Sequence, residues 1–264
     1  MTAKRERHIL ALSGGKDSAA LAVYMREKHP EIPLEYVFID SGCELPETYE
    51  YLDRIRAVLS IEIISIRSPR GFEYWLKYYG GVLPSPTNRW CTRQLKLRPY
   101  KEWLRQHCRG TRVYSYVGLR ADEDREGYRP SDENIIPVHP FIDNRLMIDD
   151  IIQILSDVGL GMPSYYSWRQ RSGCFFCFFQ RDNEWRGLRT NHPTLFEKAC
   201  QYEEQHSDGR TYTWRDNGSL RDLSSTAGNG MPEAIKNRPL LIDSMAGINV
   251  QPFNPENLLI RDKK

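Results

Sequence analysis

Short apolar runs alternate with longer segments of mixed polarity along the first half of the chain. The apolar runs have the length and the β-branched or aromatic content of strands, and they span residues 8–12, 34–40, 61–66, 113–117 and 134–138. Segments 18–28 and 46–59 between them have the length of helices, and Pro46 suits a first helical turn. This alternation predicts an α/β fold: a doubly wound, mostly parallel sheet with helices on both faces and ligands bound beyond the C-terminal strand ends.

The alternation fades near residue 160. Beyond it, a helical pattern covers 193–204, and the tail from Asp208 onward is rich in Gly, Asn, Pro and Arg. We therefore expect an α/β domain over residues 1–160 and a helical or irregular C-terminal region over 161–264. That second region carries the sequence Cys-Phe-Phe-Cys at 174–177.

The sequence Ser-Gly-Gly-Lys-Asp-Ser at residues 13–18 lies where the first strand ends and the first helix begins. Its two glycines allow the backbone to turn sharply and to bring N–H groups close to a ligand. The helix start adds unpaired amides and the positive end of its dipole, while Lys16, Ser13 and Ser18 add a full charge and hydroxyl donors. The stretch therefore predicts an anion site, although its spacing is not that of the Walker A loop. The alternative is a glycine-rich turn whose lysine has no such role.

Two further polar residues follow predicted strands and are expected at the same edge of the sheet. Asp40 ends the second strand, where it lies beside the loop or simply caps a turn. Arg120 follows the fourth strand and is expected either to reach a phosphate group or to form a surface ion pair with Asp122 or Glu123.

Basic residues cluster after the proline-containing loop 80–88. Residues 89–98 are expected to form a helix that ends before Pro99, and three basic residues spaced i, i+4 and i+7 then share one of its faces: Arg89, Arg93 and Lys96. The segment 89–109 contains a single acid, Glu102, and a charged face of this kind is ordinarily only solvated. Trp90 and the neighbouring prolines favour instead a surface for phosphate or nucleic acid.

The composition is that of an ordinary globular protein, with 40% hydrophobic and 27% charged residues. The net charge is only +2, so a surface for nucleic acid would have to be a local patch. No apolar run approaches the roughly 18 residues that span a bilayer, and the run 9–12 is too short for a secretory signal. We therefore expect a cytoplasmic protein without a membrane partner, whose six cysteines are thiols, metal ligands or catalytic groups rather than disulfides.

Cys174 and Cys177 have a spacing that allows both sulfurs to bind one centre, as in thioredoxin-like, zinc and iron–sulfur sites. A thioredoxin motif opens a helix early in its domain, and a zinc site usually takes a second ligand pair that the sequence lacks. The four phenylalanines around these cysteines provide an apolar pocket, which favours an iron–sulfur cluster. The ordinary alternative is a pair of reduced thiols in the core.

These motifs resemble those of the PP-loop ATP pyrophosphatases and, among these, of the phosphoadenylyl-sulfate (PAPS) reductase family. The resemblance extends over roughly residues 8–205 and is carried by segments 13–18, 38–49, 89–98, 118–123 and 174–180. It implies an adenine nucleotide α-hydrolase-like fold that uses ATP with Mg²⁺. The chain departs from the family at Trp90, where the family has the first cysteine of a pair.

The resemblance also implies roles for individual residues. It implies that ATP is bound by the loop and by the two strand-end residues, namely Ser13, Gly14, Gly15, Lys16, Ser18, Asp40 and Arg120. Lys16, Asp17 and Ser18 would be catalytic, with Asp17 either helping to bind Mg²⁺ or serving only as an acid in the first helical turn. The basic face defined above would hold phosphates of the substrate.

Cys91, Cys174 and Cys177 together resemble the ligands of the [4Fe–4S] clusters in adenylyl-sulfate reductases and DNA phosphorothioation enzymes. The fourth ligand stays open: Cys108 and Cys200 are candidates, although each also fits a buried cysteine of a helix. A cluster with three protein ligands would leave one iron free to bind sulfide, as in some tRNA thiolases.

Two departures from the true reductases indicate a different reaction. The chain keeps Lys16, which reductases alter because their substrate has no pyrophosphate to lose, and no cysteine follows Cys200. The chain most resembles DndC/SspD-type proteins, so we expect an ATP pyrophosphatase that adenylates an oxygen of the DNA backbone for replacement by sulfur. The implied partners are DNA, a cysteine desulfurase as sulfur donor and other phosphorothioation subunits. The alternatives are a tRNA thiolation enzyme, an adenylyl-sulfate or PAPS reductase, and a non-catalytic sensor of ATP and redox state.

Overall fold

Five parallel strands form one sheet in the order β3-β2-β1-β4-β5. The strands span Glu6–Leu12 (β1), Leu34–Asp40 (β2), Ile63–Arg67 (β3), Arg112–Tyr116 (β4) and Ile135–Val138 (β5). The computed structural model describes residues 5–124, 130, 132–203 and 209–225. The strand order reverses at β1, and open sheets of this kind bind ligands beyond the C-terminal ends of the strands at that point. The predicted doubly wound α/β fold is confirmed.

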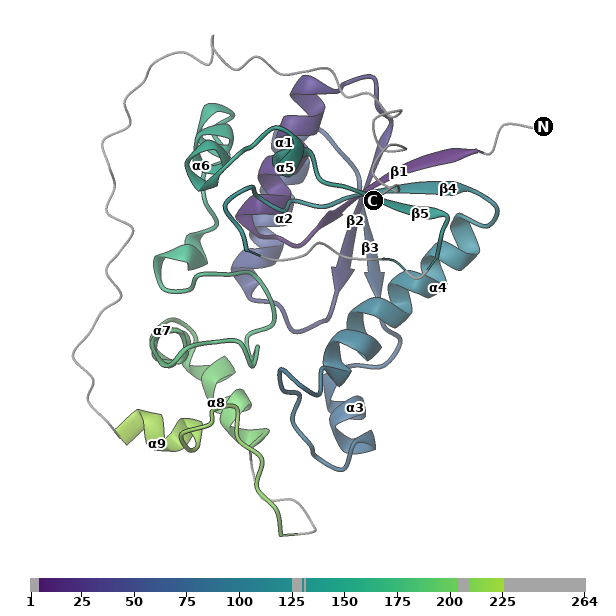
Figure 1. Cartoon of the computed structure of the whole chain (residues 1–264). Helices are drawn as coiled ribbons and strands as arrows, with labels where there is room; N and C mark the ends of the chain where they lie inside the picture. The colour runs from purple at the N-terminus through teal and green to yellow at the C-terminus, as the bar shows by residue number, and fades with distance from the viewer. Residues whose placement is uncertain (1–4, 125–129, 131, 204–208, 226–264) are drawn as a thin grey trace.

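Helices cover both faces of the sheet (Figure 1). One face carries α1 (Lys16–Lys28), α2 (Pro46–Leu59), α5 (Pro140–Asp143) and α6 (Ile148–Asp157), and the other carries α4 (Arg98–His107). Among the described residues, no helix has the length and apolar content needed to cross a bilayer.

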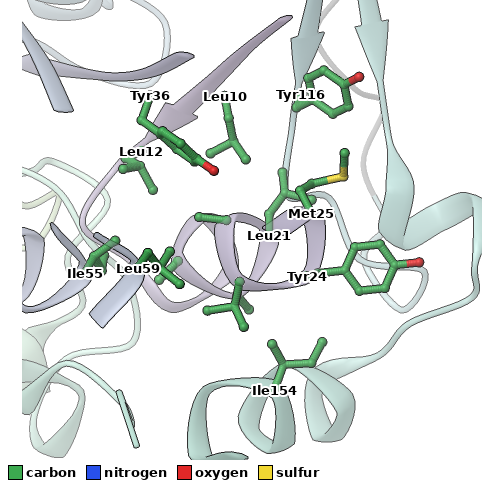
Figure 2. Packing of buried hydrophobic residues seen from close by; sticks show 14 of the residues in the cluster. Leu10, Leu12, Leu21, Tyr24, Met25, Tyr36, Ile55, Leu59, Tyr116 and Ile154 are labelled. Carbon is green, nitrogen blue, oxygen red and sulfur yellow. The ribbon is translucent and has the colours of Figure 1, made fainter. Parts of the chain in front are cut away.

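The larger core lies between the sheet and α1. Figure 2 shows Leu10 and Leu12 of β1 on the side of the sheet that packs against α1, whereas Ile9, which directly precedes Leu10, belongs to the core beneath α4. The residues of α1 from Ser18 to Met25 are all buried, because α6 packs against this helix as well. A helix covered in this way is apolar around its whole circumference, and it fixes the position of the loop that precedes it.

The C-terminal region has a separate, mainly aromatic core. Its helices are α7 (Asp182–Asn191), α8 (Pro193–Gln201) and α9 (Leu220–Ser225), preceded by the 3₁₀ turn η2 (Ser164–Ser167). This core also takes in residues from before position 160, among them Phe72 of α3 (Phe72–Tyr78) and Trp90. Phe72 stacks on Trp90 at 5.1 Å between ring centroids.

The segment expected as a helix over 89–98 differs from that prediction. Helical structure begins at Trp90, continues as the π-helix η1 (Thr92–Leu97) and leads directly into α4. Pro99 does not end the helix, because it is the second residue of α4, which continues without a break from the π-helical turn.

Candidate active site

Residues 13–18 form the loop that the sequence predicts between β1 and α1. Gly14 has φ +71°, and a Cβ atom there would collide with the side chain of Thr48. The Ser18 hydroxyl accepts a hydrogen bond from the Ser13 amide at 3.0 Å and donates one to the Gly15 carbonyl at 3.1 Å. The glycines and hydroxyls therefore fix one tight turn at the C-terminal edge of the sheet.

Three predicted site residues form one ion-pair network at this loop. The ammonium group of Lys16 lies 2.9 Å from one oxygen of Asp17, whose other oxygen accepts a hydrogen bond from Arg120 at 2.7 Å. Arg120 also pairs with Asp122 at 2.8 Å and with Glu123 at 2.9 Å. The expected surface ion pairs are therefore present, and the same guanidinium reaches the loop. Binding of ATP by these residues stays a prediction.

Asp40 lies at the end of β2, beside the end of β1. Its carboxylate is 8% exposed and accepts hydrogen bonds from the Gly42 amide at 2.7 Å and the Tyr49 hydroxyl at 2.8 Å. Asp40 thus caps a turn, which was one of its two expected roles. A contact with adenosine stays a prediction.

Cys91, Cys174 and Cys177 line one cavity of about 270 Å³, although Cys91 is far from the other two in sequence. Phe176, Phe178 and other apolar side chains form part of its wall. Burial raises the pKa of the Cys91 and Cys174 thiols, so both are neutral until a positive centre displaces their protons. Three soft sulfur donors in an apolar cavity match the chemistry of an iron–sulfur cluster. Within the described part of the chain, however, no three His, Cys, Asp or Glu side chains already form a metal-binding group.

The two candidates for a fourth cluster ligand lie outside this cavity. Cys108 is the C-terminal cap of α4 and lies near the start of β1, where its sulfur accepts a hydrogen bond from Arg7 at 3.2 Å. Cys200 lies within α8 and is 2% exposed. Both are buried cysteines of a helix, which was their alternative interpretation, and neither lines the cavity.

A buried acid that the sequence analysis did not single out lies beside the cysteines. The side chain of Glu44 is 1% exposed, and one of its oxygens accepts hydrogen bonds from the Ser41 hydroxyl at 2.9 Å and Lys96 at 3.2 Å. The same hydroxyl lies 3.2 Å from the sulfur of Cys174. Glu44 is the main reason that the pKa of Lys96 is raised. The sequence feature that could have indicated Glu44 is its position just after β2, at the edge of the sheet that also holds the loop 13–18.

The prediction that Arg89, Arg93 and Lys96 share one helical face is wrong. Arg89 precedes the helix, and a π-helical turn holds more residues than an α-helical one, which changes the angle between the other two. Arg89 and Lys96 line the cysteine cavity, whereas Arg93 lines a groove on the other side of the helix. Lys96 is moreover paired with Glu44, so its charge is already balanced.

The loop and the cavity meet at Ser172. This residue lines the cavity, and its hydroxyl lies 3.4 Å from that of Ser13, within hydrogen-bond distance. A Cβ atom on Gly15 would lie 2.7 Å from the Ser172 hydroxyl oxygen, so the two segments are packed as closely as glycine allows. Arg169, which is 1% exposed, donates hydrogen bonds to the carbonyls of Gly173 and Cys174 at 3.1 and 2.8 Å. It holds the cysteine segment in place.

Two tyrosines of the turn η2, in the C-terminal region, contact the loop 13–18. Tyr165 is fully buried and donates a hydrogen bond to the Gly14 carbonyl at 2.7 Å. The ring of Tyr166 lies 5.1 Å from the ammonium of Lys16, a cation–π distance. Nothing in the sequence pattern marked either residue, because both contacts join segments that are far apart in the chain.

Comparisons with known proteins agree with this architecture. Residues 7–139 match the family model described as the phosphoadenosine phosphosulfate reductase domain. An uncharacterized protein of Methanocaldococcus jannaschii is 28% identical over 215 residues, which is 76% of this chain and 43% of that protein. This chain spans less than half the length of the curated relatives that it matches.

Two solved structures are similar at low sequence identity. The PAPS reductase of Candida auris has a TM-score of 0.51 at 13% identity, covering 64% of this chain and 81% of that one. The U34-tRNA thiolase NcsA of Methanococcus maripaludis, solved with its [4Fe–4S] cluster, has a TM-score of 0.44 at 15% identity, covering 76% and 72%. The similarity to the PAPS reductase structure supports the fold alone. Because the family match spans half of the sequence, the chain belongs to the phosphoadenosine phosphosulfate reductase domain family.

Proposed function

We propose that this protein is an ATP pyrophosphatase that replaces an oxygen of its substrate with sulfur. The observation that carries the proposal is the contact between the two halves of the site. Ser172 lines the cysteine cavity and lies against Ser13 of the anion-binding loop, so a nucleotide on the loop and sulfur at the cavity would be neighbours. A site that only bound or cleaved a nucleotide would not need three thiols at this edge of the sheet.

In the first step, a substrate oxygen attacks the α phosphorus of ATP. A bond from that oxygen to phosphorus forms, the bond to the bridging oxygen breaks, and pyrophosphate leaves with the charge. Lys16 and the amides at the start of α1 stabilise that charge. Lys16 would exchange its contact with Asp17 for a phosphate oxygen, which frees the carboxylate. Asp17 is the residue that would hold Mg²⁺, which supplies further neutralisation of the phosphates.

In the second step, the atom that carries the adenylated oxygen bonds to sulfur at the oxidation level of sulfide, and AMP leaves with the oxygen. Cys91, Cys174 and Cys177 would hold a [4Fe–4S] cluster, which when bound supplies iron with an affinity for sulfur. The chain's own contribution is a largely apolar cavity with Arg89 and Lys96 in its wall. Arg89 would favour an anionic sulfur species and the departing AMP, whereas the charge of Lys96 is balanced by Glu44.

The acceptor that we propose is a non-bridging oxygen of the DNA backbone, with a cysteine desulfurase and other phosphorothioation subunits as partners. The support for a nucleic acid is the concentration of basic residues over 89–109, where Glu102 is the only acid. A tRNA base is the second candidate acceptor, because the same charges would attract either nucleic acid.

The test begins with purified full-length protein and Mg²⁺-ATP. We expect AMP and pyrophosphate as products, and we expect Lys16→Ala to lose this activity while a matched change on the same helix, Lys28→Ala, keeps it. Release of ADP and orthophosphate would contradict the proposed reaction. The acceptor is identified by mass analysis of nucleosides from cells carrying each variant. Phosphorothioate dinucleotides that disappear with Lys16→Ala support DNA, and thiolated tRNA bases in their place would overturn that choice.

A further inference from the structure

A groove of about 1210 Å³ lies on the opposite side of the η1–α4 helix from the cysteine cavity. Its walls are the segment 65–70 at the end of β3, helix α3, and the helical segment from residue 93 to residue 106. Figure 1 shows α3 near the start of α4, below the C-terminal end of β3, with α4 running from there along the sheet towards β5. Six basic residues line the groove: Arg67, Arg70, Arg93, Arg98, Lys101 and Arg105.

Most of this positive charge is not neutralised by the protein. Glu102 is the only acidic residue in the lining, and it pairs with Arg105 at 2.7 Å. Arg70, Arg98 and Lys101 are exposed and form no salt bridge with any residue that the structure describes. The whole chain has a net charge of only +2, so this groove is a local concentration of charge that suits a polyanion.

Aromatic rings occupy the wall that α3 contributes. Tyr78 is 66% exposed and Tyr74 is 43% exposed, the first being the most exposed large hydrophobic residue in the described chain. Tyr78 is held edge-on against Trp75 at 5.4 Å and Tyr79 at 5.2 Å. The guanidinium of Arg70 lies 4.0 Å from the centroid of the Tyr74 ring. Rings fixed in this way beside cations form a surface on which bases can stack.

We propose that this groove binds a single-stranded stretch of nucleic acid. Its phosphates would lie on the basic residues of α4, and its bases would stack on Tyr74 and Tyr78. A duplex keeps its base faces inside the helix and could use only the charges, whereas unpaired bases also use the rings. The proposal rests on the proposed function in one respect, since it takes the bound strand to contain the sulfur acceptor.

The position of the groove fits that use. Arg93 and Gln94 line the groove, and Cys91 and Lys96 line the cysteine cavity from the same helix. An α-helix with its side chains is only about 10 Å across, so a strand in the groove lies one helix width from the cavity.

The test is a binding titration of full-length protein with a labelled strand of about 20 nucleotides and with the matching duplex, without ATP, at several salt concentrations. We expect the single strand to bind more tightly. Arg98→Gln/Lys101→Gln should flatten the log–log salt slope for the single strand by about 1.4, because each phosphate contact contributes about −0.7. The control Arg26→Gln/Lys28→Gln removes two exposed cations at the end of α1 and should leave the slope unchanged.

Variants of the two tyrosines distinguish base stacking from general electrostatic attraction. Tyr74→Ala/Tyr78→Ala should weaken single-strand binding about tenfold for each ring and leave duplex binding nearly unchanged. Photo-crosslinking of a DNA strand that contains bromodeoxyuridine should label peptides of α3. Equal affinity for the duplex, equal slopes for the groove and control pairs, or no effect of the tyrosine pair would each overturn the proposal. None of these readouts requires ATP cleavage, so a failure here is distinct from a failure of the Lys16 test.

Discussion

The buried pair of Glu44 and Lys96 gives the sharpest prediction about the candidate site. Among the described residues, Lys96 is the only cation within salt-bridge distance of the Glu44 carboxylate, whose side chain is 1% exposed. Lys96→Met removes this cation and keeps most of the apolar stem. The second oxygen of Glu44 has no hydrogen-bond partner among the described residues, so that carboxylate has little other stabilisation. The change should therefore destabilise the fold.

The size of the effect follows from the burial of each partner. Breaking a fully buried ion pair costs about 3–5 kcal/mol. The side chain of Lys96 is 37% exposed, however, and the Ser41 hydroxyl still donates to Glu44, so we expect a loss of about 1–3 kcal/mol. Glu44→Gln should cost less, because a neutral amide keeps an acceptor for Ser41. The double variant should be more stable than the sum of the two changes predicts, by at least about 0.5 kcal/mol.

Urea unfolding of the wild type, the two single variants and the double variant measures these terms. The matched control is Arg93→Met, which removes an exposed cation from the same π-helical segment. If Lys96→Met costs no more than Arg93→Met, or if the two single changes are additive, the pair has no stabilising role and our account of the cavity wall is wrong.

Two further predictions concern the cysteines and an acid near the C-terminal core. Anaerobically prepared Cys91→Ser, Cys174→Ser and Cys177→Ser should each lose bound iron and acid-labile sulfide, whereas Cys108→Ser, outside the cavity, should keep both; equal iron in all four would refute the ligand assignment. Burial opposes ionisation of Glu73, but hydrogen bonds from Lys198 and Tyr202 outweigh it and lower the pKa to about 2 from an ordinary 4.5. Glu73 therefore stabilises the fold above about pH 4.5, and this contribution is lost as the pH falls towards 2, so the gap in urea midpoint between wild type and Glu73→Gln should shrink on acidification. The corresponding difference in the free energy of unfolding should stay below about 1 kcal/mol because the Glu73 side chain is 55% exposed, and a midpoint gap that widens at low pH would contradict this sign.

The features that the sequence predicts correctly are those that local pattern determines. The strands, the loop at 13–18 and helices α1 and α2 follow from apolar runs and from glycines at a strand end. That Cys91 lies near Cys174 and Cys177 could be expected only from the family resemblance, because the spacing of the residues does not indicate it. The cavity that all three line is consistent with it.

The features that the sequence does not predict depend on contacts between distant segments. The π-helical turn at Thr92–Leu97 changes the phase of the helix by less than one turn, and no residue pattern marks it. That small change places Arg93 in the groove and Lys96 in the cavity, on opposite sides of one helix. Glu44 becomes significant only because Lys96 and Cys174 pack against it. Arg169 and Tyr165 likewise act on residues that lie in other parts of the chain.

A large part of the candidate site lies outside the segment that identifies the family. The family match ends at residue 139, before Tyr165, Ser172, Cys174 and Cys177. Those four residues close the anion-binding loop from one side and supply two of the three sulfurs in the cavity. In the proposed function, the matched segment would supply the nucleotide site, whereas the proposed sulfur transfer would depend on how the later residues fold onto it. The aromatic core that contains Phe72, Trp90 and residues of the C-terminal helices packs these later residues against the matched segment. A change in this core should therefore alter the cysteine cavity before it alters the sheet.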